Sequence, residues 1–239
     1  MRTDSNTAKQ TVREMVWGLL ERQQIAPGTH GHIPRFAGAR DAADHLASLP
    51  VWDEARVLKV NAADAQLPVR TRALAANKVV YMSVPRLADA NPFYLLERSD
   101  VSPSRAATAA GAEVLSRKVA IGDLQPVDIL VCGSVAVNRH GVRIGNGAGY
   151  SDLEVALLTE VGLVGEHTKI VTTVHSLQVI DGSLPETEHD VRVDLIVTPD
   201  EVIECGPQPR PPGLIWDHLD RAKIDQIPVL AARARGEVA

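Results

Sequence analysis

The chain has 239 residues, a formal net charge of −5 and a pI near 5.9. Hydrophobic residues make up 45 % and charged residues 23 % of it, which is typical of a globular protein long enough to bury a core without disulfides. Aromatic residues are only 3 % and no basic stripe stands out, which argues against nucleic-acid binding. No apolar run approaches a membrane span. The polar N-terminus and the isolated Cys132 and Cys205 predict a cytoplasmic protein with buried thiols.

Helical and extended segments alternate through the first half of the sequence. Residues 1–6 are expected to form a frayed tail, and Thr7 is placed to cap a helix at 7–21. Lys9 and Arg13 lie four residues apart in that helix, so they project from the same side. The pattern of apolar residues further predicts helices at 40–49, 70–76 and 105–115 and strands at 56–60, 78–84 and 128–132.

The second half of the sequence continues this alternation. Its expected elements are a glycine-rich stretch at 141–152, a helix at 151–161, strands at 168–175 and 193–197, a Pro-rich segment from about 206 and a helix at 216–222. Strands that alternate with helices predict an α/β fold with a mainly parallel central sheet and helices on both faces. No linker divides the sequence, so residues 1–239 are predicted to form one domain with a Pro-rich C-terminal extension.

The glycine-rich stretch carries the strongest functional signal. Gly145, Gly147 and Gly149 alternate directly before the predicted helix. Glycine lets the backbone approach a ligand closely, and consecutive backbone N–H groups at a helix start bind anions. Arg143 adds a cation that can hold a phosphate with two hydrogen bonds, and Asp152 is a potential ligand for Mg²⁺. The spacing fits neither a Walker A loop nor a G-x-G-x-x-G fingerprint, and a glycine-rich turn without a ligand is the alternative.

Histidines and arginines elsewhere offer weaker signals. His30 and His32 share one loop, but no third ligand stands at the spacing of a closed zinc site. His175, at the end of a predicted strand, is interpreted as a structural histidine, and a catalytic role is the alternative. Arg35 and Arg86 follow prolines in loops, where they either bind an anionic substrate or are solvated surface groups.

The motif G-x-R-x-G-x-G-x-G-Y-x-D at 141–152 resembles the nucleotide loop of the 5-formyltetrahydrofolate cyclo-ligase family. The resemblance extends to Lys9 and Arg13, to the strand P-V-D-I-L-V before the loop, to Gln178, and to the segments L-P-E…H-D and V-D-L-I-V-T-P. Stretches such as I-P-R-F at 33–36 are similar to the branch of methenyltetrahydrofolate synthetase domain-containing proteins.

This resemblance implies a cyclo-ligase fold of the NagB, RpiA and CoA-transferase type and an ATP- and Mg²⁺-dependent enzyme. The implied reaction converts 5-formyltetrahydrofolate into 5,10-methenyltetrahydrofolate through a phosphorylated formyl group. Such a reaction needs positioned phosphates and neutralised charge more than acids or bases. Lys9, Arg143 and Tyr150 are the implied catalytic residues, and Asp152 and Asp190 are the implied Mg²⁺ ligands. The residues implied in ATP binding are Lys9, Arg13, Arg143, Gly145, Asn146, Gly147, Ala148, Gly149 and Tyr150.

Two departures from the family pattern concern the substrate side. Ser151 and Leu153 stand where the family has a second tyrosine and an arginine. Residues 61–66 contain no glutamate of the kind that grips the pterin in the family. The nearest candidates for that role, together with the tyrosine of the loop, are the predicted substrate contacts Asp64, Gln66 and Tyr150.

Because a carboxylate on the ring edge decides folate specificity, two alternatives stay open. One is an ATP-using relative that acts on a different small amide, formyl or heterocyclic substrate. The other is a non-catalytic nucleotide- or folate-binding protein. In each case the expected partner is a small molecule, a folate or a related compound, rather than nucleic acid or a membrane. No feature of the sequence predicts an oligomeric state.

Overall fold

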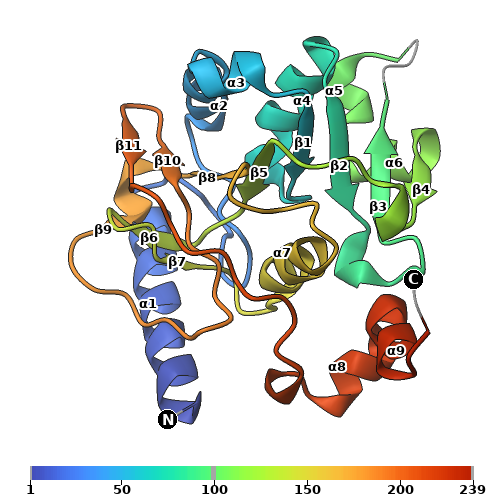
Figure 1. Ribbon diagram of the computed structural model, residues 1–239. Coiled ribbons are helices and arrows are strands. Elements are labelled where there is room, and N and C mark those ends of the chain that lie inside the picture. The colour runs from blue at the N-terminus through green and yellow to red at the C-terminus, as the bar shows by residue number, and fades with distance from the viewer. Residues whose placement is uncertain (1, 98–100, 238–239) are drawn as a thin grey trace.

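An eight-stranded sheet lies at the centre of the protein (Figure 1). The computed structural model describes residues 2–97 and 101–237. Across the sheet the strands follow the order β11-β10-β8-β5-β1-β2-β3-β4. Their bounds are β1 (Val57–Val60), β2 (Val79–Ser83), β3 (Phe93–Leu96), β4 (Arg117–Val119), β5 (Ile129–Cys132), β8 (Lys169–Thr173), β10 (Leu195–Val197) and β11 (Val202–Glu204). The strands from β10 to β2 run parallel, while β3, β4 and β11 pair antiparallel. The predicted mainly parallel α/β sheet is confirmed.

The strand order has a topological switch point between β1 and β5. From β1 the chain adds β2, β3 and β4 on one side, and then β5, β8 and β10 on the other. In open α/β sheets ligands bind at such a point, outside the carboxyl ends of the strands. Asn61 follows β1 at this edge, and Gly133 follows β5. The topology therefore marks where a functional site is expected.

Helices cover both faces of the sheet, as predicted. Leu46 and Leu74, from the second and fourth helices, pack on one face, whereas Leu157 and Leu158 of the seventh pack on the other (Figure 1). Burial on both faces explains why β1 and β5 are nearly continuous apolar runs. The α-helices are α1 (Arg2–Arg22), α2 (Ala39–Ala47), α3 (Pro50–Glu54), α4 (Leu67–Ala75), α5 (Pro103–Ala106), α6 (Ala109–Leu115), α7 (Tyr150–Glu160), α8 (Arg221–Gln226) and α9 (Pro228–Ala234). The 3₁₀ helices are η1 (Asp64–Gln66), η2 (Pro85–Leu87), η3 (Ile121–Asp123), η4 (Ser176–Gln178) and η5 (Trp216–His218).

A second, three-stranded sheet lies beside α1 (Figure 1). Its strands, in the order β7-β6-β9, are β6 (Ala136–Asn138), β7 (Arg143–Ile144) and β9 (Val179–Ile180). Val16 and Leu20 of α1 belong to one apolar cluster with Val135 and Ile144. This packing holds α1 beside β7, the strand that leads into the glycine-rich loop.

Three predicted helices have different bounds in the structure. The first begins at Arg2 rather than at Thr7, because the polar residues between them include no glycine or proline to break it. The helix predicted at 105–115 is broken at Thr108, whose hydroxyl instead caps the start of α6. The C-terminal helix predicted at 216–222 is replaced by η5, α8 and α9. Within the described ranges, no helix has the length and apolar character needed to cross a membrane.

Candidate functional site

A cleft of about 600 Å³ opens at the switch point of the sheet. It is bordered by the segments that follow β1, β2 and β5, by the loop before α2 and by the start of α7. Asn61, Ser83, Gly133 and Arg143 are among its lining residues. A cleft of this size lies within the range of small-molecule sites in proteins. We name it the switch-point cleft.

The glycine-rich loop forms one wall of the switch-point cleft. Gly147 has a φ of 101°, and a Cβ there would lie 3.4 Å from the guanidinium carbon of Arg13, so glycine suits both the backbone and its neighbour. Gly149, with a φ of 71°, is the N-cap of α7. The loop thus ends at a helix N-terminus, where free amides and the helix dipole favour an anion.

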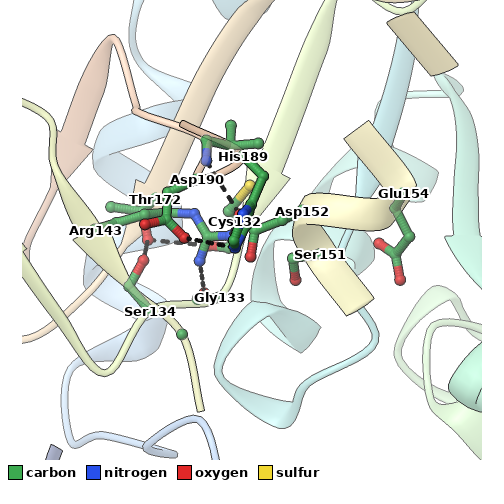
Figure 2. Close-up of polar contacts among 12 residues, drawn as sticks. Cys132, Gly133, Ser134, Arg143, Ser151, Asp152, Glu154, Thr172, His189 and Asp190 are labelled. Atoms are coloured by element: carbon green, nitrogen blue, oxygen red, sulfur yellow. Dashed lines mark hydrogen bonds and ion pairs between the residues drawn. The ribbon is translucent and has the colours of Figure 1, made fainter. Parts of the chain in front are cut away.

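Arg143 is held in a fixed position by contacts within the chain. Its guanidinium donates hydrogen bonds to the carbonyl oxygen of Gly133 at 3.2 Å and to Oδ1 of Asp152 at 2.8 Å (Figure 2). Burial opposes its charge, but the nearby carboxylates, Asp152 first, outweigh burial and raise the pKa of Arg143. Arg143 is therefore a permanent cation, and its Nε is a buried donor without a partner among the described residues.

The helix α1 brings two more cations to the same place. Lys9 donates a 2.5 Å hydrogen bond to Oδ2 of Asp190, and Nε of Arg13 donates one of 2.8 Å to the carbonyl oxygen of Gly145. Burial lowers the pKa of Arg13, although carboxylates partly compensate. A pocket of about 90 Å³ is lined by these cations together with the loop, and its charged members are Lys9, Arg13, Arg143, Asp152 and Asp190. We name it the phosphate pocket.

The two carboxylates that were predicted to hold Mg²⁺ both line the phosphate pocket. The hydrogen bonds to Asp152, from Arg143 and from the amide of Val191, fall on Oδ1. Those to Asp190, from Lys9 and Thr187, fall on Oδ2. The second oxygen of Asp152 accepts no hydrogen bond from the described residues, and that of Asp190 lies 3.8 Å from Nε2 of His189. Mg²⁺ commonly uses one or two carboxylates and completes its shell with water and phosphate oxygens, so this pair fits that ion.

Protein side chains alone do not form a complete metal site in the described part of the chain. Among residues 2–97 and 101–237, no group of three or more His, Cys, Asp and Glu side chains is arranged to hold a metal ion. His30 instead contacts Glu14 and Glu21, at 3.2 Å each, while His32 lines the switch-point cleft. His175 accepts a 3.1 Å hydrogen bond from the amide of Leu177 and so caps η4, which agrees with a structural role.

Of the three residues predicted to contact the substrate, two line the switch-point cleft and one does not. Asp64 and Tyr150 line the switch-point cleft. Gln66 does not: its side chain is fully buried and donates hydrogen bonds to the backbone and hydroxyl oxygens of Thr173. Gln66 is the last residue of η1, and its bonds to Thr173 hold its side chain in the protein interior, outside the lining of the cleft.

Arg35 and Arg86 line the same cleft from two different loops. Both side chains are exposed, and neither has an ion-pair partner among the residues that the structure describes. Arg86 adopts a left-handed conformation with φ of 58°. Such conformations cost free energy in residues other than glycine and gather at functional sites. The cleft therefore has free cations at its mouth in addition to those of the phosphate pocket.

A buried ion pair at the cleft was not predicted. Lys59, in the middle of β1, donates a hydrogen bond to Oε2 of Glu154 on α7, and both side chains are at most 5 % exposed. Glu154 also lines the switch-point cleft. One signal was available in the sequence: each residue is a lone charge within an otherwise apolar stretch, V-L-K-V and L-E-V-A-L-L.

The C-terminal segment also reaches the glycine-rich loop. Lys223 of α8 donates a 2.6 Å hydrogen bond to the carbonyl oxygen of Ala148, and its Nζ lies 5.1 Å from the centre of the Tyr150 ring. Burial lowers the pKa of Lys223. Nearby, the Nδ1 atoms of His189 and His218 lie 2.9 Å apart. No local pattern in the sequence announces these contacts, since they join segments more than 25 residues apart.

Sequence comparisons identify relatives over nearly the whole chain. The profile of the 5-formyltetrahydrofolate cyclo-ligase family matches residues 5–199. A methenyltetrahydrofolate synthase domain-containing protein of Mus musculus is 36 % identical over 244 residues, which cover 96 % of this chain and 64 % of the mouse protein. The chain thus spans less than two thirds of that relative's length. A mitochondrial 5-formyltetrahydrofolate cyclo-ligase of Arabidopsis thaliana is 31 % identical over 87 residues, 35 % of this chain and 31 % of that protein.

The fold has a counterpart among solved structures. The NMR structure of a 5,10-methenyltetrahydrofolate synthetase of Aquifex aeolicus matches with a TM-score of 0.53 and covers 90 % of this chain and 99 % of that one. Its sequence identity is 18 %, so this likeness concerns the fold. The profile match, the mouse relative and the predicted loop motif agree with one another. The chain therefore belongs to the 5-formyltetrahydrofolate cyclo-ligase family.

Proposed function

We propose that this chain is an ATP- and Mg²⁺-dependent enzyme that converts 5-formyltetrahydrofolate into 5,10-methenyltetrahydrofolate. The observation that carries the proposal is the convergence of Lys9, Arg13 and Arg143 on one pocket that adjoins a substrate-sized cleft. Several fixed cations beside a glycine-rich loop are suited to bind the negatively charged phosphates of a nucleoside triphosphate. Membership of the cyclo-ligase family supports the same reaction.

In this reaction the formyl oxygen of the substrate attacks the terminal phosphorus of ATP, and ADP leaves. N10 then attacks the activated formyl carbon and loses its proton. Cleavage of the carbon–oxygen bond releases inorganic phosphate and completes the methenyl bridge. The second step closes a ring within one molecule, so most of what the protein contributes is position and charge.

The residues of the phosphate pocket divide this work. Arg143, already fixed by Asp152, orients the transferred phosphate, while Lys9 and Arg13 neutralise its charge. Mg²⁺, when bound at Asp152 and Asp190, supplies further neutralisation of the phosphate oxygens. The negative charge of the bound phosphates is thus neutralised by fixed side chains of the pocket rather than by mobile water.

The switch-point cleft would hold the folate. Tyr150 lines the cleft directly after Gly149, which lines both the cleft and the phosphate pocket, and would contact the substrate near the reacting formyl group. The carboxylates of a folate's glutamate tail have partners in Arg35 and Arg86, whose exposed guanidinium groups border the cleft. The cleft and the adjoining phosphate pocket thus supply cations both for the carboxylates of the tail and for the transferred phosphate.

The test is the absorbance of methenyl-folate. Purified protein is mixed with 5-formyltetrahydrofolate, ATP and Mg²⁺, and the methenyl absorbance band is followed with time. We expect a rise that requires ATP and stops when Mg²⁺ is chelated. A flat trace from folded protein that binds ATP in calorimetry would overturn the proposed reaction while leaving the nucleotide site intact.

A second candidate is an ATP-using relative that acts on another small amide, formyl compound or heterocycle. It is favoured by the segment after β1, where residues 61–66 contain no glutamate and Gln66 is turned away from the cleft. A non-catalytic nucleotide- or folate-binding protein is the third candidate. Hydrolysis of ATP that starts only when a formyl or amide compound other than the folate is added would identify the second, and ligand binding without turnover would identify the third.

A further inference from the structure

The ion pair of Lys59 and Glu154 is unusual in its position. Lys59 lies within a parallel strand that is buried along its whole length, and Glu154 lies on the buried face of α7. Removing two charges from water costs much of what their attraction returns, so a buried ion pair is a poor device for stability. Glu154, however, also borders the switch-point cleft. The pair is therefore better explained by what the cleft binds.

Lys59 bonds only one of the two oxygens of the Glu154 carboxylate. Its Nζ bonds Oε2 of Glu154, and no hydrogen bond from the described residues reaches Oε1. Figure 2 shows Glu154 and Asp152 on different sides of α7, with Asp152 beside Arg143. One helix thus presents one carboxylate to the phosphate pocket and another to the cleft. The ammonium of Lys59 fixes the orientation of the Glu154 carboxylate.

A second polar group borders the cleft without a partner. The hydroxyl of Ser83, at the end of β2, is 4 % exposed as a residue and has no hydrogen-bond partner in the described part of the chain. Buried hydroxyls almost always have a partner, so the hydroxyl of Ser83, like that of Thr29 in the same lining, is available for a ligand contact. Asn61, which also lines the cleft, is already engaged by a 2.8 Å hydrogen bond to Ser151.

We propose that Glu154 binds the substrate's ring edge, and that its target is a nitrogen heterocycle with two neighbouring N–H donors, as in a pterin or an aminopyrimidine. The free Oε1 of the Glu154 carboxylate accepts one of these N–H groups in a charge-assisted hydrogen bond. The hydroxyl of Ser83 supplies the second contact, and Lys59 acts as the positioning residue. The proposal rests on the proposed function, since it names how the same cleft recognises its substrate.

Two single variants and one double variant test the proposal. Ligand binding is measured by titration with 5-formyltetrahydrofolate and, separately, with pterin, which lacks the formyl group and the tail. We expect Glu154→Gln to weaken both affinities by about tenfold or more, and Ser83→Ala by roughly threefold to tenfold. ATP affinity should stay within about twofold of the wild type, since neither side chain lines the phosphate pocket. Glu113→Gln, an exposed carboxylate on α6, is the matched control and should change none of the three affinities.

Folding is controlled by a further variant. Glu154→Gln leaves the ammonium of Lys59 buried without a charged partner, which destabilises the protein. The double variant Lys59→Met with Glu154→Gln removes that charge, and thermal unfolding shows whether it is folded. If the folded double variant binds pterin as tightly as the wild type, the proposal is wrong.

The outcomes separate this proposal from the proposed function. Pterin binding that depends on Glu154, in a protein that forms no methenyl-folate, would support the role of Glu154 and overturn the cyclo-ligase reaction. Formation of methenyl-folate by Glu154→Gln with an unchanged KM for 5-formyltetrahydrofolate would support the cyclo-ligase reaction and overturn the role of Glu154. A wild-type protein that binds neither pterin nor 5-formyltetrahydrofolate would overturn the role of Glu154.

Discussion

Arg143 and Asp152 form an ion pair in which the arginine side chain is 1 % exposed and the aspartate 20 %. The same carboxylate oxygen accepts the amide of Val191, so the pair connects β7, α7 and the segment that carries Asp190. Because these contacts are made within the chain itself, the guanidinium would lose little freedom on binding an anion. A side chain that is already fixed loses less conformational entropy on binding than a flexible one, so the affinity is higher.

Replacement of Arg143 is expected to damage ATP binding. Arg143→Ala removes charge-assisted hydrogen bonds and should weaken ATP binding by about 1.5–3 kcal/mol, while Arg143→Lys, which keeps the charge but loses the planar fork, should weaken it less. Titration calorimetry measures both, with circular dichroism to confirm folding. An unchanged ATP affinity in folded Arg143→Ala would refute the phosphate role of this residue.

Lys9 should contribute to nucleotide binding through charge. Lys9→Met leaves Asp190 without its cation and adds net negative charge to the phosphate pocket, so we expect ATP affinity to fall by about tenfold. The matched control is Lys118→Met, because Lys118 is also paired with a carboxylate, that of Asp89 at 2.8 Å, but lies on the surface away from the pocket. Equal ATP affinities for the two variants would show that Lys9 has no part in binding.

The contact of Lys223 with the glycine-rich loop predicts an effect from outside the region that the family profile covers. Lys223→Met removes the hydrogen bond to Ala148 and the cation over the ring of Tyr150. Since the loop then loses an anchor, we expect the KM for ATP to rise by roughly threefold to tenfold. Arg221→Ala, an exposed residue of the same helix, should leave the KM unchanged. A KM that does not respond to Lys223→Met would show that α8 is not part of the site.

His175 predicts a component of the pH dependence of stability. Its Nδ1 accepts the amide of Leu177, which requires an unprotonated nitrogen, and burial lowers the pKa of His175 despite the opposing charge of Asp200. The unfolded chain therefore takes up this proton first as the pH falls. The free energy of unfolding should decrease as the pH is lowered through about 6.5 and level off below the folded pKa.

The variant His175→Asn isolates this component. Asparagine keeps a capping oxygen but does not titrate. Urea unfolding of both proteins between pH 7.5 and 5.5 gives a difference in unfolding free energy, which should shrink as the pH falls. The other histidines cancel in this difference, including His30, whose pKa is raised by Glu21. A difference that does not vary with pH would contradict the assignment.

Local patterns predicted the central elements because each satisfies a short-range rule. The strand at 128–132 is a nearly unbroken apolar run, and the loop is recognisable because glycine occupies every second position from 145 to 149. The strands β6, β7 and β9 were missed because two or three residues show no period. The strand β3 was missed because it pairs antiparallel with β2 after a proline-rich turn, without the helix that the alternation led us to expect.

The sequence by itself determined the α/β class, the loop and the presence of Arg143 and Asp152 at its two ends. Lys9 and Asp190 were placed in the site by family resemblance, since they are 181 positions apart and no periodicity reaches that far. Only the tertiary structure decided that Gln66 faces Thr173, that Lys59 pairs with Glu154, and that α8 touches the loop. The physical reason is range. Backbone propensity and amphipathic periodicity act over one or two turns, whereas an ion pair between distant segments exists only once the sheet and its helices have packed.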